Sequence, residues 1–211
     1  MECEDQPYLA YPPHQSYLPH PRTRITRKSK RRLTLFTEVP TLDAVLREYA
    51  TALARDLTAY RNHTYRVVNL CAAQIAPDAD SLEKIAIAAA FHDLGIWTDD
   101  TFDYLAPSVK HAKTYLACHG RSEWTAEIAE MICQHHKVSA YGGAAGSLVE
   151  PFRRADWIDV TRGLRSFGVS KPLLREVFAT WPNAGFHRRL AQLEVGQLRT
   201  RPWNPLPMVK L

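Results

Sequence analysis

The sequence lacks any long apolar run. No stretch of its 211 residues approaches the roughly 18 consecutive apolar side chains that a membrane-spanning helix needs. The N-terminus has no apolar signal-peptide core, and its acidic residues Glu2, Glu4 and Asp5 are unusual for a transit peptide. We therefore expect a soluble cytoplasmic protein with no membrane partner.

Cysteine is scarce, and its spacing excludes two kinds of site. The chain has four cysteines and no CxxC pair, so neither a zinc knuckle nor a dithiol redox motif is predicted. Strand signals are missing as well, since there is no sustained period-two alternation, hairpin dipeptide or internal repeat. These absences favour an all-α fold.

Acidic residues are absent from one basic segment. Residues 22–32 hold seven Lys or Arg and no acid, so this segment alone carries more positive charge than the formal net charge of +5. Because three acids precede it, the chain from Leu33 onward carries only +1. That charge gives no reason to expect a specific nucleic-acid surface, and the basic run is typical of a solvated tail.

Composition divides the chain into three parts. Residues 1–38 are rich in Pro, Tyr, His and basic side chains without an apolar period, which predicts a mostly unstructured N-terminal tail. Residues 39–200 hold enough apolar residues for one core, so we expect a single domain there. Residues 201–211 would form a C-terminal extension.

Apolar residues of the domain recur at three- and four-residue intervals, which predicts a helical bundle. Thr41 would cap the first helix, and Asp80 with Glu83 would cap the third. Pro172 and Pro182 sit where first-turn prolines belong. The expected helices cover roughly 42–53, 58–76, 80–93, 107–119, from 122, 148–164, from 172, and 182–198.

Three of these helices place polar residues on apolar faces. His63, His92 and Asp156 each share a helical stripe with apolar neighbours, and Asp93 directly follows His92. Burying these groups without partners would cost several kcal/mol. If the helices pack as a bundle, their faces converge, and a shared cation would remove that cost.

A divalent metal explains this pattern, because zinc, manganese, iron, cobalt and nickel all accept His nitrogen and carboxylate oxygen. Asp93 could bridge two such ions at about 3.5–4 Å separation. His135 and His136, with His111 from the preceding helix, would complete a second position. We expect one metal ion, and the sequence leaves open whether a second ion binds.

The order of these residues resembles the HD superfamily, which is named for a His-Asp pair on a helical scaffold. The matching elements are His63, the phrase Phe-His-Asp-Leu-Gly-Ile around His92-Asp93, the doublet His135-His136, and Ala155-Asp156. They span roughly residues 42–164. Residues 101–108 and 183–190 are similar to a branch of small bacterial HD-domain proteins, so the resemblance implies an HD-domain bundle.

The resemblance implies four ligands of one metal, which are His63, His92, Asp93 and Asp156. In two-metal members, which include di-iron oxygenases, histidines on the intervening helices bind the second ion. Here these would be His111 and one or both of His135 and His136. The helix angle of His111 falls at the edge of an apolar arc, so it points either to the site or to solvent. Asp159, one turn beyond Asp156, is an alternative ligand.

The resemblance also implies an enzyme, a metal-dependent phosphohydrolase or phosphodiesterase acting on a small phosphoester or nucleotide. A metal with an open position lowers the pKa of its water to about 7 and supplies hydroxide. The expected catalytic residues are Asp93, Lys137 and Arg66. The positively charged side chains of Lys137 and Arg66 would clamp the negative charge of the phosphoryl group. Arg61 and Arg153 are further candidate clamps, and no Walker-type phosphate loop is present.

Three alternatives stay open. One is a di-iron oxygenase acting on a small polar molecule, and another is a hydratase of a nitrile-like molecule such as cyanamide, with a single zinc. The last is a binding domain that keeps its metal for folding alone. The expected partner of the hydrolase is a phosphorylated small molecule, and the apolar final helix could form a homodimer.

Overall fold

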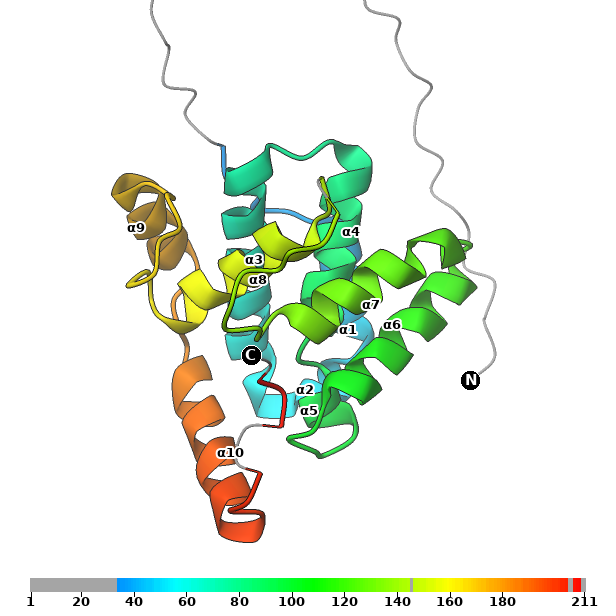
Figure 1. Ribbon diagram of the computed structural model, residues 1–211, viewed down its shortest axis with the longest axis vertical. Coiled ribbons are helices and arrows are strands. Elements are labelled where there is room, and N and C mark those ends of the chain that lie inside the picture. Colours follow the sequence, from blue (N-terminus) through cyan, green and yellow to red (C-terminus); the bar gives the residue numbers. More distant parts are fainter. Residues whose placement is uncertain (1–33, 145, 205–206, 210–211) are drawn as a thin grey trace, which may run out of the picture. The chain divides into compact units, whose positions relative to one another are not determined.

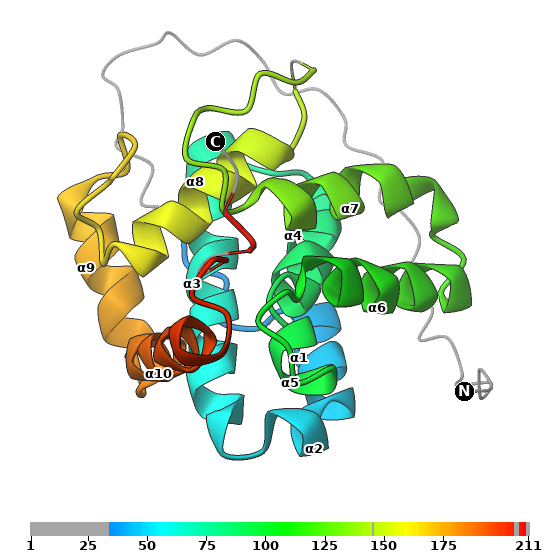
Figure 2. The ribbon, with the colours of Figure 1, turned by 60° about the horizontal axis from the view of Figure 1, so that its bottom comes forward.

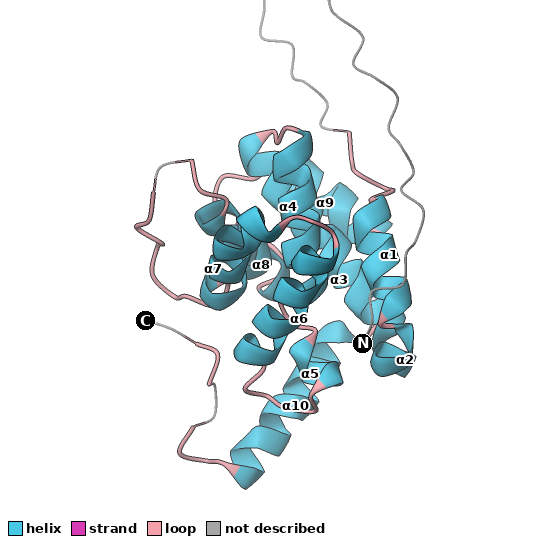
Figure 3. Ribbon diagram, turned by 90° about the vertical axis from the view of Figure 1, so that its right-hand side faces the viewer, coloured by secondary structure: helices cyan, strands magenta, loops and turns pink. Residues whose placement is uncertain are grey.

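The computed structural model describes residues 34–144, 146–204 and 207–209. Within these ranges the chain forms helices and loops and no strand, which confirms the predicted all-α bundle (Figure 1, Figure 3). The described residues group into one compact unit. The predicted basic tail up to residue 33 lies outside the described residues.

The helices match most of the predicted periodic segments. They are α1 (Pro40–Glu48), α2 (Ala50–Leu53), α3 (Leu57–Ile75), α4 (Ala79–Phe91), α5 (Gly95–Thr98), α6 (Leu105–Cys118), α7 (Thr125–Gln134), α8 (Val149–Val160), α9 (Lys171–Thr180) and α10 (Phe186–Thr200), with short 3₁₀ helices at Ala54–Asp56 and Ser122–Trp124. No helix in the described part of the chain is long and apolar enough to cross a membrane.

Helix α3 lies at the centre of the bundle. It packs mainly against α4 and α8, and it also contacts α9 and α10 (Figure 2). Every residue from Ala59 to Ala72 except Arg61 is buried. A helix enclosed in this way has no face turned to water, so its polar residues must find partners inside the protein.

Helix α4 ends in a fully buried run, Ile85–Phe91, that packs against α1, α3, α6 and α7. Its cap is Asp78, which has an extended backbone and accepts a 2.8 Å hydrogen bond from the N–H of Ser81. The predicted caps were wrong, because Glu83 instead accepts a 2.7 Å bond from the hydroxyl of Thr41. That bond ties α1 to α4.

Other helix boundaries also differ from the prediction, and α8 ends at Val160 instead of at about residue 164. The first expected helix is divided at Tyr49 into α1 and α2. Pro172 lies in the first turn of α9, as predicted, but Pro182 does not begin a helix. The Pro182 carbonyl accepts a 2.8 Å bond from Asn62 of α3, and α10 begins at Phe186. Contact with α3 thus decides where the last helix starts.

Gly95 fixes the turn that follows the His-Asp pair. Its N–H donates to the hydroxyl of Ser108 at 3.0 Å, and a Cβ at this position would lie 2.6 Å from the Tyr104 carbonyl oxygen. Only glycine allows α5 and the start of α6 to approach so closely. This contact holds the residues after α4 in place beside the bundle centre.

Both ends of the described chain lie against the bundle. At the N-terminal side, the backbone of Phe36 bonds the Asn69 side chain twice, at 2.8 and 3.1 Å, and Val39 is buried. At the C-terminal side, Met208 is buried in a small apolar cluster with Ile96, Tyr104 and Leu105. Part of each predicted terminal extension therefore packs on the domain.

Candidate metal centre

Residues from four helices converge in the interior of the bundle. His63 lies in α3 and Asp156 in α8, while the pairs His92-Asp93 and His135-His136 directly follow α4 and α7. Their ligand atoms form two groups, each within 4.8 Å, namely His63, His92 and Asp93, and then Asp93, His135 and His136. The structure thus brings together six of the seven residues predicted as metal ligands.

Three of the histidines are oriented by bonds to Nδ1. His63 bonds Asp159 through Nδ1 at 2.6 Å. His92 and His135 each bond, through Nδ1, the carbonyl oxygen three residues earlier, at 2.9 and 2.6 Å. These acceptors place the hydrogen of a neutral ring on Nδ1, so each Nε2 presents a lone pair to the interior.

The Nε2 atoms of His63 and His92 lie only 2.9 Å apart. Asp93 Oδ2 is 3.6 and 3.4 Å from these two nitrogens, and Asp156 Oδ1 is 3.6 and 3.7 Å from them. Two lone pairs and two carboxylates facing each other repel unless a cation, either a proton or a metal ion, lies among them. This donor set fits one divalent metal.

A second group of donors lies beside the first. Asp93 Oδ1 is 3.3 Å from Nε2 of His135, and neither atom has a hydrogen-bond partner among the described residues, although both are buried. Oδ2 of Asp156 is also buried without a hydrogen-bond partner among the described residues, and it lies 3.8 Å from Nδ1 of His136. Buried polar atoms without a bond are rare, and a second cation here would satisfy them.

The carboxylates of the cluster are held ionised. Burial alone would raise the pKa of Asp93 and of Asp156, but the imidazoles of His92 and His135 bring both pKa values below the usual range. Burial lowers the pKa of His92, yet the two carboxylates outweigh it and raise this pKa to about 9. A proton therefore occupies the metal-free cluster, and a metal would displace it.

Tyr104 adds a neutral hydroxyl to the cluster. Its oxygen lies 2.7 Å from Nε2 of His136. Burial, followed by the charges of Asp93 and Asp156, raises the pKa of Tyr104 well above its usual value. The sequence does not predict this contact between Tyr104 and a candidate ligand, because no spacing rule relates the two residues.

His111 is the predicted ligand that the structure does not bring to the cluster. Its Nε2 pairs with Asp99 at 3.0 Å, and its ring meets the edge of Tyr49 at 5.7 Å between centroids. The residues of α6 that are buried in the bundle include Ala112 and Leu116 instead. His111 therefore lies on the outer side of the apolar arc, and we remove it from the ligand set.

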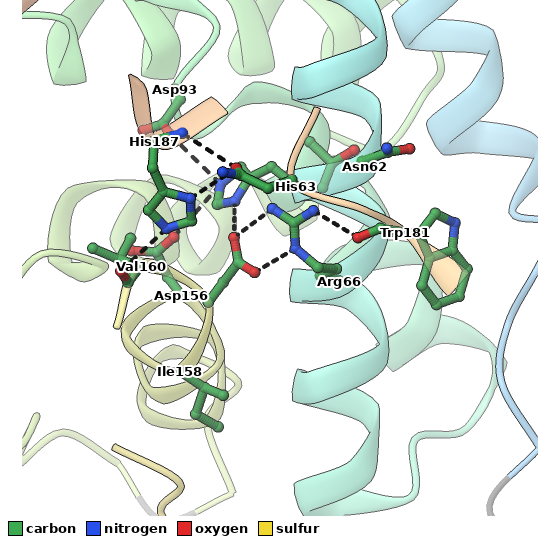
Figure 4. Close-up of polar contacts among 12 residues, drawn as sticks. Asn62, His63, Arg66, Asp93, Asp156, Ile158, Val160, Trp181 and His187 are labelled. Atoms are coloured by element: carbon green, nitrogen blue, oxygen red, sulfur yellow. Dashed lines mark hydrogen bonds and ion pairs between the residues drawn. The ribbon is translucent and has the colours of Figure 1, made fainter. Parts of the chain in front are cut away.

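The structure places Arg66, a predicted substrate clamp, in the interior of the bundle, and its role as a clamp stays a prediction. Its guanidinium is buried, it bonds both carboxylate oxygens of Asp159, and it donates to the Trp181 carbonyl at 3.0 Å (Figure 4). Burial would raise the pKa of Asp159, but the bonds from His63 and Arg66 lower it to about 2. Arg66, Asp159 and His63 thus form a chain that orients a candidate ligand, and Asp159 acts through His63.

The other basic residues named from the sequence have structural partners or untested roles. Arg153 bonds both oxygens of Glu150, and Arg61 pairs with Asp43. The carbonyl of Lys137 accepts bonds from Arg153 and from Trp157 at 2.9 and 3.0 Å, which fixes the backbone after His136. The catalytic role of the Lys137 ammonium stays a prediction.

Comparison of the chain with protein-family models, with curated proteins and with solved structures found no match. The resemblance to the HD superfamily therefore rests on the order of the residues themselves. What the structure adds is that His63, His92-Asp93, His135-His136 and Asp156 form a buried cluster that could hold a metal ion.

Proposed function

We propose that the protein is a metal-dependent hydrolase of the HD type, acting on a small molecule, with a phosphoester as the first substrate class to test. One observation carries the proposal. The Nε2 lone pairs of His63 and His92 face each other at 2.9 Å, each fixed by an Nδ1 bond, beside the ionised Asp93 and Asp156. Such an arrangement supports a resident cation.

Each residue of the cluster has a distinct role in this proposal. When bound, a divalent metal supplies a Lewis acid that activates water at neutral pH. His63, His92 and Asp156 hold the ion, while the two oxygens of Asp93 face both donor groups. Tyr104 offers a neutral hydroxyl donor, and burial of the whole set keeps bulk water away.

Metal content is the first test. Natively purified protein should contain a divalent metal, and folded Asp93→Ala should lose it, because both donor groups use Asp93. His111→Ala is the matched control and should keep the full metal content, since His111 pairs with Asp99 away from the cluster. Full metal content in folded Asp93→Ala would show that the site is misplaced.

Activity is the second test. A panel of nucleotides and small phosphoesters, assayed with manganese, cobalt or nickel, should show phosphate or nucleoside release that Asp93→Ala abolishes. Silence across this panel would contradict the phosphoester as substrate class, while the metal site would still stand on elemental analysis.

A di-iron oxygenase is the second candidate, and the group Asp93, His135 and His136 favours it because it offers a place for a second ion. Protein purified without oxygen should then hold two irons, and His135→Ala should lower the iron content to about one per chain. One zinc or manganese per chain, without iron, would exclude this candidate.

A further inference from the structure

The loop between α9 and α10, residues 181–185, is bonded to α3 on either side of His63 in the sequence. The side chain of Asn62 donates to the Pro182 carbonyl at 2.8 Å. The guanidinium of Arg66 donates to the carbonyls of Trp181 and Pro182 at 3.0 and 3.3 Å (Figure 4). Since Asn62 directly precedes His63 and Arg66 follows it by about one helical turn, the loop runs beside a candidate metal ligand.

This loop ends in a tight turn that leads into Phe186, the first residue of α10. The N–H of Phe186 donates to the Asn183 carbonyl at 2.9 Å. The two residues between them have left-handed backbones, with φ of 50° at Ala184 and 92° at Gly185. Among the described residues of α10, only Phe186 is buried, at 1 % exposure. The turn therefore directs this one aromatic ring of α10 into the interior.

Phe186 lies flat against the imidazole of His63. The two ring centroids are 4.1 Å apart, and the ring planes differ by 15°. The rings of His92 and Tyr60 lie farther from His63, at 5.0 and 6.3 Å, and are tilted by 43° and 37°. Among the described residues, Phe186 is therefore the ring that packs parallel on His63.

The stacked ring and the bond to Asp159 restrain His63 in different ways. The 2.6 Å bond between Nδ1 and Asp159 acts in the plane of the imidazole and decides which nitrogen is left for a metal. A ring packed on the face of the imidazole opposes its rotation out of that plane. Together they hold Nε2 of His63 at 3.6 Å from oxygens of both Asp93 and Asp156.

We propose that Phe186 is a positioning residue of the candidate metal centre, which acts through His63 and holds its Nε2 in the direction that a metal needs. The inference rests on the proposed function in one respect, because it takes His63 as a metal ligand. The stacked contact itself exists without a metal, so it can be tested separately.

The test replaces the ring by an aliphatic side chain in the full-length protein. Phe186→Leu should weaken Co²⁺ binding about threefold to tenfold, because His63 loses its stacked partner while the site stays apolar. Competition with a chelator measures the affinity. The visible absorption bands of bound Co²⁺ should also shift, because they depend on the geometry of the donors.

Leu116→Val is the control for loss of packing, because Leu116 is fully buried in α6, a helix that supplies no ligand to the cluster. It should lower the free energy of unfolding and leave the Co²⁺ affinity and spectrum unchanged. In the metal-free protein, the ring current of Phe186 should move the NMR signals of the His63 ring protons upfield, and Phe186→Leu should abolish that displacement.

Native Co²⁺ affinity and spectrum in folded Phe186→Leu would overturn the inference. So would His63 ring-proton signals that are the same in the metal-free native protein and in Phe186→Leu. Native protein that takes up no Co²⁺ would instead contradict the proposed function, so the two failures are distinguishable.

Discussion

Residues that do not touch the proposed metal decide how its ligands point. Asp159 accepts the Nδ1 hydrogen of His63 and two donors of Arg66, and these bonds keep it ionised despite its burial. Removing that charge would leave Arg66 unpaired in the interior and His63 without its orienting acceptor. Partners of this kind often matter to metal affinity nearly as much as the ligands do.

Asp159→Asn should weaken metal binding by about 10–100-fold, because His63 loses the carboxylate that fixes its ring. Competition with a chelator of known affinity measures the change. Asp43→Asn is the control, since it makes the same chemical change at the partly exposed partner of Arg61. Native metal affinity in folded Asp159→Asn would contradict the orienting role.

The sequence reveals single residues better than their partners. His63, His92 and Asp156 could be found because each is a polar residue on an apolar helical stripe. The direction of His111 could not be decided, because its position at the edge of the apolar arc allows its side chain to point either to the site or to solvent. The role of Asp159 could not be found, because its partner His63 lies 96 positions away and only packing brings the two together.

At the scale of helices, periodicity predicts where helices exist, but contacts between helices decide where they begin. Asp78 rather than Asp80 caps α4, and the Pro182 carbonyl is taken by Asn62 of α3. Packing between helices also determines the turn after His92-Asp93. Its Gly95 could be identified as a turn residue, whereas its close contact with Tyr104 follows only from the packing of α5 on α6.

Gly95→Ala should destabilise the fold by ~1–3 kcal/mol, because the added Cβ would overlap backbone atoms at the start of α6. Gly196→Ala in α10 is the matched control, since a Cβ there meets no described atom within 4 Å and alanine favours a helix by up to ~1 kcal/mol. Urea unfolding of both variants measures the two effects. Equal free energies of unfolding would show that the Gly95 contact is not tight.

For the whole molecule, the cluster links metal binding to the stability of the bundle, because its ligands come from α3 and α8 and from the residues directly after α4 and α7. In the metal-free protein the pKa of His92 is raised to about 9, above its ordinary value of about 6.5. The resulting stabilisation is complete below pH ~6.5 and is lost as pH rises through about 9.

His136 has the opposite effect on how stability depends on pH. Burial and the neighbouring His135 lower its pKa to about 4, so stability is lost as pH falls from about 6.5 toward 4. The metal-free protein should therefore be most stable near pH ~6.5, where neither histidine contributes a loss.

Metal binding should remove the alkaline loss, because a bound ion replaces the proton that His92 gives up. The difference in Tm between metal-loaded and metal-free protein should therefore grow as pH rises from about 6.5 to about 9. Calorimetry with and without the native metal at several pH values measures it, and folded Asp93→Ala should show no metal-dependent shift at any of them. A difference in Tm that stays constant or shrinks over this range would mean that the metal does not compete with a proton on His92.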